Sequence, residues 1–343
     1  MRIACPRDWR GEDVTAMNNA AQISHLELLK SLSRSFLIQK RALGFKYVSI
    51  EGTLNRLLRF VEFNGLEAPY LTQDLISDFC LPKIGEAPKT HANRCSDIRQ
   101  FAKFLNMNEF EAYVPATPLK TRSSFTPYIF THDEIGRIMS AADSIKSHKR
   151  YNCAEVYPIL FRVLYGCGLR ISEALNLKVC DVDMKQGVLT IRNSKFNKSR
   201  LVVMSASLTE ACTALMSKIH LLTNDDDYFF KNRDGSQRNK GTVSDRFREL
   251  LWESNIPYRG KGYGPRLHDL RHSFCCHALK QMSQSGIDMY CSLPVLSTFI
   301  GHSSIKATER YLRLTEEFYP DIVQKMNTSL TSVYPEVYRA DTY

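Results

Sequence analysis

The sequence predicts a mainly α-helical protein of two domains with one small antiparallel β-hairpin. Its 343 residues are enough for two domains of ordinary size, each with its own core. Across much of the chain the apolar residues recur at spacings of three and four, which is typical of amphipathic helices. Residues 187–204 instead alternate between apolar and polar side chains on both sides of a polar turn. We therefore expect helices to build both cores and the hairpin to be an exception within the second domain.

The first domain is expected over residues 21–112, after a loose N-terminal arm of residues 1–20 that shows no strong periodicity. Its pattern predicts four helices, over His25–Leu37, over Ser49–Phe63, from a cap at Thr72 through Phe79, and near His91–Leu105. The segment from Gly85 to Pro88 should break the chain before the last of them. Short helices with basic flanks are suited to gripping DNA, so we expect a small DNA-binding domain here.

The last helix of this domain carries a basic stripe. It consists of Lys89, Arg94, Arg99 and Lys103. Such side chains bind phosphates, but they equally form an ordinary solvated helix face. We regard Arg94, Arg99 and Lys103 as candidates for DNA contacts, with the solvated face as the alternative.

A linker is expected over residues 113–126, where Pro115 and Pro118 interrupt any helix. The second domain should then cover residues 127–330, before a C-terminal tail of residues 331–343. Its first helix is predicted to begin at Thr131, because Thr131 and Glu134 have the spacing of a capping box. Further helices are expected over Ala154–Tyr165, Thr242–Trp252 and Glu316–Leu330.

The hairpin of the second domain should have a basic tip. Its strands are predicted at Gly187–Asn193 and Arg200–Met204, joined by the polar segment Ser194–Ser199. A glycine-rich loop over Pro257–Pro265 adds two more cations. The candidates for DNA contacts in this domain are Lys198, Arg200, Arg259 and Lys261.

The charge balance favours a polyanionic partner. The formal net charge is +10, from 46 basic and 36 acidic residues, and the excess is spread along the chain. A distributed positive field suits a long polyanion better than a single anionic pocket. Many soluble proteins are equally basic for other reasons, so charge alone leaves nucleic acid as one option.

The ten cysteines do not indicate a disulfide framework. The first residues lack an apolar segment of signal-peptide length, and no apolar run approaches the ~18 residues of a membrane span. We therefore expect a cytoplasmic protein with reduced thiols and no membrane partner. His272, Cys275, Cys276 and His277 crowd one segment, but without a second cluster at zinc spacing we interpret them as side chains on a helix rather than as a metal site.

Six residues of the second domain have the chemistry needed to break and rejoin a phosphodiester without a metal. Arg170 lies in Gly-Leu-Arg-Ile-Ser-Glu, Lys195 lies at the hairpin tip, and His268 and Arg271 lie in His-Asp-Leu-Arg-His. His302 follows Gly301, and Tyr311 comes nine residues later. Two arginines, a lysine, two histidines and a phenol supply phosphate ligands, proton donors and a nucleophile.

In order and spacing these segments resemble the signature boxes of the tyrosine recombinase (phage integrase) family. The resemblance implies a helical core-binding domain and a catalytic domain that together form a C-shaped clamp around DNA. It implies a site-specific recombinase or integrase that needs no cofactor, acts as a tetramer on double-stranded DNA and exchanges strands through a Holliday junction. Accessory recombinases or directionality factors are possible partners. The 31 positions between Arg271 and His302 are more similar to integrases carried by transposons or other mobile elements than to compact members of the family.

The resemblance also assigns roles. Arg170 and Arg271 would hold the scissile phosphate with permanently charged, planar forks, and Glu173 would support them. Tyr311 would form a 3′-phosphotyrosine, with Tyr319 as the alternative nucleophile. Lys195 would protonate the leaving 5′-oxygen, with Lys198 as its rival, and His268 and His302 would contact the phosphate and move protons.

Two other functions stay open at this point. A type IB topoisomerase would use the same chemistry to relax supercoils as a monomer. A catalytically silent DNA-binding accessory protein would retain the fold without the reaction. The helix over Glu316–Leu330 would pack either on a neighbouring protomer or on its own domain.

Overall fold

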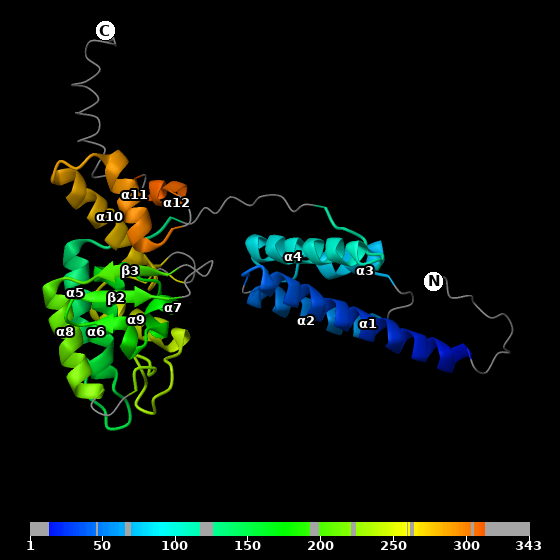
Figure 1. Cartoon of the computed structure of the whole chain (residues 1–343), viewed down its shortest axis with the longest axis horizontal. Helices are drawn as coiled ribbons and strands as arrows, with labels where there is room; N and C mark the ends of the chain where they lie inside the picture. Colours follow the sequence, from blue (N-terminus) through cyan, green and yellow to red (C-terminus); the bar gives the residue numbers. More distant parts are fainter. Residues whose placement is uncertain are drawn as a thin grey trace, which may run out of the picture. The chain divides into compact units, whose positions relative to one another are not determined.

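The chain folds into two compact units, Met1–Ser124 and Phe125–Tyr343. The computed structural model describes residues 14–45, 47–65, 70–116, 126–192, 199–220, 224–258, 260, 264–302 and 305–312 (Figure 1). The boundary between the units falls inside the expected linker of residues 113–126. The finer domain limits stay predictions.

The first unit contains the four expected helices. They are α1 (Val14–Ala42), α2 (Val48–Asn64), α3 (Gln73–Cys80) and α4 (Pro88–Met107). The expected loose arm of residues 1–20 overlaps α1, which begins at Val14. Thr72 caps α3 as predicted, with its side-chain oxygen accepting a hydrogen bond of 3.3 Å from the Leu75 amide.

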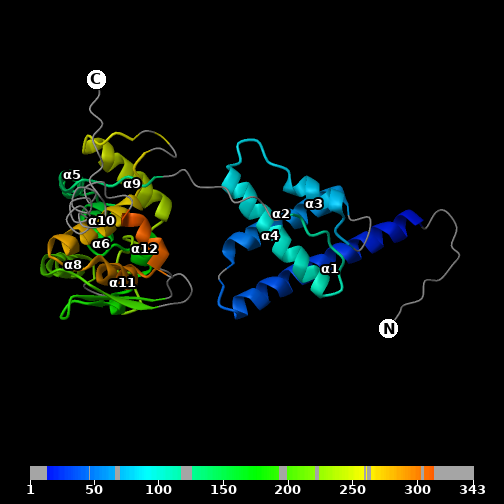
Figure 2. The same ribbon diagram turned by 90° about the horizontal axis from the view of Figure 1, so that it is seen from above.

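The core of the first unit forms where α4 packs on α1 and α2 (Figure 2). Leu54, Leu57 and Val61 make the apolar face of α2 and are fully buried. Phe36 of α1 packs against Phe101 of α4 with ring centroids 5.5 Å apart. Helix-spaced apolar residues therefore explain this unit without any further element.

The second unit is helical around a small sheet. Its helices are α5 (His132–Asp143), α6 (Cys153–Gly166), α7 (Ile171–Asn176), α8 (Ala206–Ile219), α9 (Lys240–Glu253), α10 (Asp269–Gln284), α11 (Met289–Ile300) and α12 (Ile305–Leu312). The capping box is present at the start of α5: Thr131 accepts from the Glu134 amide, and Glu134 accepts from the Thr131 amide. The helices α8, α11 and α12 were not predicted, and the helix expected over Glu316–Leu330 lies outside the described residues.

The sheet confirms a small antiparallel element in a mainly helical protein. The strands β2 (Val188–Ile191) and β3 (Arg200–Val203) pair with Val188 opposite Val203 and Ile191 opposite Arg200. A two-residue strand, β1 (Val182–Asp183), joins the other edge of β2 after the short 3-10 helix η1 (Val179–Asp181). Leu189, Ile191 and Val202 are buried, so one face of the sheet faces the core.

Two cores stabilise the second unit. The larger one lies among α5, α6 and α9, where Phe130, Phe161 and Phe247 are fully buried. The smaller one lies among α10, α11 and α12, which group together in Figure 1, and it contains Leu296 and Tyr311. In the part of the chain described here, no helix combines the length and the apolar character that a membrane span requires.

Candidate active site

Five of the six residues predicted for catalysis gather in the second unit. Arg170 is the residue before α7, His268 is the residue before α10, and Arg271 lies in the first turn of α10. His302 directly follows the C-cap of α11, and Tyr311 lies near the end of α12. Lys195, like Lys198, lies outside the described residues. The ends of four helices thus position these side chains.

A buried carboxylate, that of Glu173, joins the arginines of the site. Arg170 donates to it at 2.7 Å, Arg200 donates at 2.9 Å, and Arg271 lies 3.8 Å away. Burial alone would raise the pKa of Glu173, but hydrogen bonds from Arg200 and from the Arg170 backbone lower this pKa to about 2. Glu173 is therefore ionised at neutral pH and partly offsets the mutual repulsion of three guanidinium groups.

The same three arginines bind the last carbonyl groups of α11. Arg200 Nε donates to the Phe299 carbonyl at 2.8 Å, Arg271 Nη2 to the Ile300 carbonyl at 2.7 Å, and Arg170 Nη2 to the Gly301 carbonyl at 3.3 Å. The final carbonyls of a helix lack partners within the helix and carry partial negative charge. This arrangement fixes the end of α11, and with it the start of the segment that leads to His302.

Gly301 fits this crowded position for a steric reason. Its φ of +67° lies in the left-handed region, where side chains are disfavoured. A Cβ atom there would also come within 2.8 Å of Arg200 Nη1. Glycine therefore allows both the end of α11 and the close approach of Arg200.

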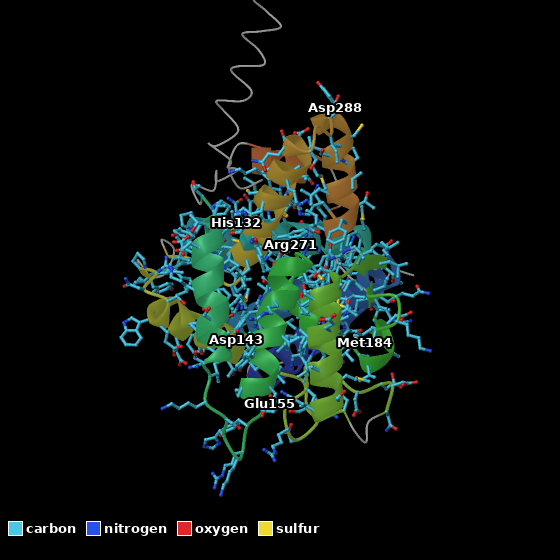
Figure 3. The ribbon with its side chains drawn as sticks, turned by 90° about the vertical axis from the view of Figure 1, so that its left-hand side faces the viewer. His132, Asp143, Glu155, Met184, Arg271 and Asp288 are labelled. Atoms are coloured by element: carbon cyan, nitrogen blue, oxygen red, sulfur yellow. The ribbon has the colours of Figure 1, made fainter. Side chains whose placement is uncertain are left out.

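Arg271 is the most enclosed of the cations. Its side chain is 2% exposed, and Nη1 donates to the Gly168 carbonyl at 2.7 Å. Burial lowers the pKa of Arg271, and the nearby charge of Arg170 lowers it further. Figure 3 shows Arg271 in the interior of the second unit, whereas Asp143 and Glu155 lie at the end opposite to Asp288, which begins α11.

The two predicted histidines are neutral at physiological pH. Desolvation by the surrounding protein, together with repulsion from Arg271 and Arg170, lowers the pKa of His302 to about 4. The pKa of His268 is lowered to about 4 by desolvation and then by Arg271 and Arg266. His302 Nδ1 shares a hydrogen bond of 2.9 Å with the Thr308 hydroxyl. Neutral imidazoles beside cations offer one N–H donor each without adding positive charge.

Tyr311 is buried beside histidine rings. Its side chain is 4% exposed, and burial raises the pKa of its hydroxyl above the usual value near 10. The ring of His302 lies nearly parallel to the Tyr311 ring at a centroid distance of 6.0 Å. His272 Nδ1 lies 3.1 Å from the Tyr311 hydroxyl. Sequence reasoning missed this contact, because it treated His272 only as a member of a possible zinc cluster.

The residues of that possible zinc cluster are separated by their packing. Cys275 and Cys276 are fully buried in the smaller core. His277 Nδ1 lies 2.8 Å from the Tyr165 hydroxyl, and its ring stacks on His132 at 4.0 Å. Among the described residues, no three His, Cys, Asp or Glu side chains are arranged to hold a metal ion.

Arg94, a candidate for DNA contacts, is enclosed within the first unit. It is 3% exposed, forms an ion pair with Glu86 at 2.6 Å, and donates to the carbonyls of Phe79 and Leu81. Its charge therefore fixes the chain between α3 and α4. Arg99 is half-buried and donates to the Pro115 carbonyl. Lys103 is exposed and remains a candidate.

The residues of the second unit that were predicted to contact DNA also include an enclosed arginine. Arg200 is 10% exposed and uses its guanidinium on Glu173 and the Phe299 carbonyl, and its role in DNA contact stays a prediction. Arg259 and Lys261 lie outside the described residues. A helical pattern shows which residues share a face, but it does not show which face a neighbouring segment covers.

The sequence matches known proteins along most of its length. The model of the phage integrase family matches residues 129–317, more than half of the chain. A putative integrase/recombinase, y4rB of Sinorhizobium fredii, is 29% identical over 85% of this chain and 95% of its own length. The tyrosine recombinase XerA of Thermococcus onnurineus is 31% identical over 64% of this chain and 69% of its own length.

Solved structures share the fold. The Tn1549 transposon integrase in complex with transposon right-end DNA matches with a TM-score of 0.59 and 16% identity, over 88% of this chain and 99% of that chain. A lambda integrase dimer bound to a core site matches with a TM-score of 0.57 and 16% identity, over 88% of this chain and 81% of that chain.

Proposed function

Since this chain belongs to the phage integrase family and is a tyrosine-type site-specific recombinase, we propose that Tyr311 is the nucleophile with which it cuts and reseals DNA. The observation that carries this proposal is the meeting of α12 with α10 and the end of α11. There Tyr311 lies beside His272 and His302, and Arg271 is close enough to influence the pKa of the Tyr311 hydroxyl. Attack on phosphorus at this position yields a 3′-phosphotyrosyl intermediate.

Arg170 and Arg271 are the proposed ligands of the scissile phosphate. Each guanidinium presents several N–H donors in a plane, which matches the nonbridging oxygens on which charge develops. Contacts to Glu173 and to the end of α11 already fix both groups, so little reorganisation is needed during the reaction. The neutral imidazoles of His268 and His302 add further donors.

The site must open before it reacts. Tyr311 and Arg271 are both nearly inaccessible to solvent. We propose that bound DNA uncovers Tyr311 and the arginines for the phosphate while α12 keeps Tyr311 beside His272 of α10.

The leaving 5′-oxygen needs a proton donor. We assign this role to Lys195, in the segment of sequence that joins β2 to β3, and keep Lys198 as the rival for the same role. A protonated amine can supply a proton to the leaving oxygen. Replacing each lysine by alanine distinguishes them, because only loss of the true acid is relieved by a better leaving group.

Strand exchange follows from the chemistry of the covalent intermediate. The phosphotyrosyl bond keeps the energy of the broken linkage, so a 5′-hydroxyl of a second duplex can reverse the attack. We propose that a tetramer on two double-stranded DNA sites performs this exchange in pairs through a Holliday junction, within the cytoplasm and with accessory factors that set direction. The DNA-bound complexes of the Tn1549 and lambda integrases support DNA as the partner.

A recombination assay tests this function. Supercoiled DNA that carries two copies of the sequence flanking the gene should give a deletion or an inversion with the wild-type protein. Arg170→Lys, which keeps the charge but loses the planar fork, should reduce this product by about 100-fold. Relaxation of DNA that carries a single site would instead favour a topoisomerase. Binding without any strand transfer would favour a silent accessory protein.

A further inference from the structure

His272 links the Tyr311 hydroxyl to a buried carboxylate. Its Nδ1 atom lies 3.1 Å from the Tyr311 oxygen, and its Nε2 atom lies 4.0 Å from Asp269 Oδ1. The Asp269 side chain is fully buried, whereas that of His272 is 17% exposed. One imidazole therefore has a phenol at one ring nitrogen and a carboxylate near the other.

The carboxylate of Asp269 is held in place by Arg266, three residues earlier in the chain. Its carboxylate accepts a hydrogen bond of 2.8 Å from the Arg266 amide and lies 3.3 Å from the Arg266 guanidinium. Burial raises the pKa of Asp269, while the hydrogen bonds and charge of Arg266 oppose this rise. A fixed carboxylate near Nε2 favours the tautomer of His272 that carries its proton on Nε2. In that tautomer, the Nδ1 lone pair faces the Tyr311 hydroxyl.

His302 and His268 are less well placed than His272 to accept the proton of the Tyr311 hydroxyl. His302 Nδ1 forms a hydrogen bond with the Thr308 hydroxyl, and the His302 ring lies nearly parallel to that of Tyr311. The ring of His268 meets that of His272 edge to face at 4.7 Å, so His268 lies beside the proton acceptor.

We propose that His272 is the general base that activates Tyr311, with Asp269 as its positioning residue. The inference rests on the proposed function of Tyr311. In cleavage, the Tyr311 O–H bond breaks and its proton moves to His272 Nδ1 while the phenolate oxygen forms a bond to phosphorus. The bond between phosphorus and the 5′-oxygen breaks, and that oxygen takes a proton from Lys195. In resealing, a 5′-hydroxyl gives its proton to the Lys195 amine as its oxygen bonds to phosphorus. The bond between phosphorus and the Tyr311 oxygen breaks, and His272 returns its proton to that oxygen.

A single-turnover cleavage assay tests this role. The substrate is the DNA duplex on which the wild type forms a covalent adduct, with sulfur replacing the bridging 5′-oxygen so that the leaving group needs no proton. His272→Ala should form the adduct about 100-fold more slowly. Added imidazole should restore at least about 10-fold of that loss, because it can occupy the space of the missing ring and accept the proton. His272→Gln keeps the volume without the base, so it should be equally slow and should not respond to imidazole.

A matched control lies one and a half turns further along α10. His277 is similarly half-buried and contacts Tyr165, away from Tyr311, so His277→Ala should cleave within about threefold of wild type. DNA binding, measured by gel shift, should be retained in all three variants. If His272→Ala does not fold, the cleavage rate of His272→Gln provides the test instead.

The outcomes separate this inference from the function on which it rests. Wild-type rates in His272→Ala and His272→Gln would overturn the role of His272 and leave Tyr311 as the nucleophile. Slow cleavage that imidazole does not rescue, with an unchanged pH–rate profile, would reduce His272 to a structural contact. No adduct with the wild type, despite tight binding, would instead contradict the proposed function itself.

Discussion

Arg200 donates a hydrogen bond of 2.9 Å to Glu173, although the two residues are 27 positions apart in the chain. This ion pair ties β3 to α7. Because the same carboxylate also binds Arg170 and lies near Arg271, one acidic side chain sets the positions of three cations. The geometry of the proposed phosphate site therefore depends on Glu173.

Replacing Glu173 by glutamine should disturb both stability and chemistry. The amide has the same shape but leaves three enclosed guanidinium groups without their counter-charge, so we expect the free energy of unfolding to fall by about 3 kcal/mol. Cleavage should slow by about 10-fold or more, because the arginines lose their fixed orientation. Urea unfolding and adduct formation measure the two effects. The control is Glu249→Gln on the surface of α9, where the pair with Arg246 is exposed. Equal stability of the two variants would contradict the role of Glu173.

The end of α11 should tolerate no side chain at position 301. In Gly301→Ala, the left-handed backbone costs about 1 kcal/mol and the contact with Arg200 adds to that cost. Gly286→Ala is the matched control, because Gly286 has a φ of +78° but open space around a built Cβ. We expect Gly301→Ala to unfold at a lower urea concentration than Gly286→Ala and to cleave more slowly. The same midpoint for both would show that the approach of Arg200 is unimportant.

Protonation of His302 should destabilise the fold in mild acid. The pKa of His302 is about 4 in the folded chain and about 6.5 when unfolded, so between these values only the unfolded chain binds the proton. The free energy of unfolding should therefore fall as the pH drops from about 6.5 toward 4, and should be insensitive to this group above about 7. The pKa of His268 is also lowered in the folded chain, so protonation of His268 should reduce the free energy of unfolding in the same direction.

Urea unfolding of wild type and His302→Asn at pH 7 and pH 5 measures this linkage. The wild type should lose roughly 1 to 3 kcal/mol more than the variant between the two values. Identical losses would mean that His302 titrates normally in the folded chain.

Arg94 and Lys103 of α4 should have opposite roles, one in stability and the other in DNA binding. Arg94→Ala leaves Glu86 without its partner beside Phe79, so it should lower the stability of the first unit by about 3 kcal/mol. Lys103→Ala should leave stability unchanged but weaken DNA binding at every sequence and reduce the salt dependence of binding by about one counterion. Binding isotherms at several salt concentrations measure this. A normal salt slope in Lys103→Ala would assign that lysine to the solvated helix face.

Local patterns predicted much of this fold. The cap at Thr72, the capping box at Thr131 and the strands on either side of the hairpin tip depend on residues a few positions apart, so the sequence alone indicates them. The strand β1 was missed because two residues carry too little pattern. The helix α8 had a usable signal, since Leu208, Cys212 and Leu215 are buried at helical spacing.

Contacts between distant segments account for what local patterns missed in the site. The motifs indicated Arg170, Arg271, His302 and Tyr311 through their order and spacing. The contact between His272 and Tyr311 depends on how α12 returns to α10, 39 residues later. The burial of Arg94 likewise depends on the loop before α4 folding back over it. No periodicity within one helix reveals either relationship.

The central claim is tested most directly by the covalent adduct. Labelled DNA from both ends of the element or locus around the gene is incubated with wild type, Tyr311→Phe or Tyr319→Phe, and SDS-resistant protein–DNA complexes are measured. We predict an adduct with wild type and with Tyr319→Phe, and none with Tyr311→Phe, although all three bind the DNA. An adduct that survives in Tyr311→Phe and disappears in Tyr319→Phe would contradict the assignment of the nucleophile.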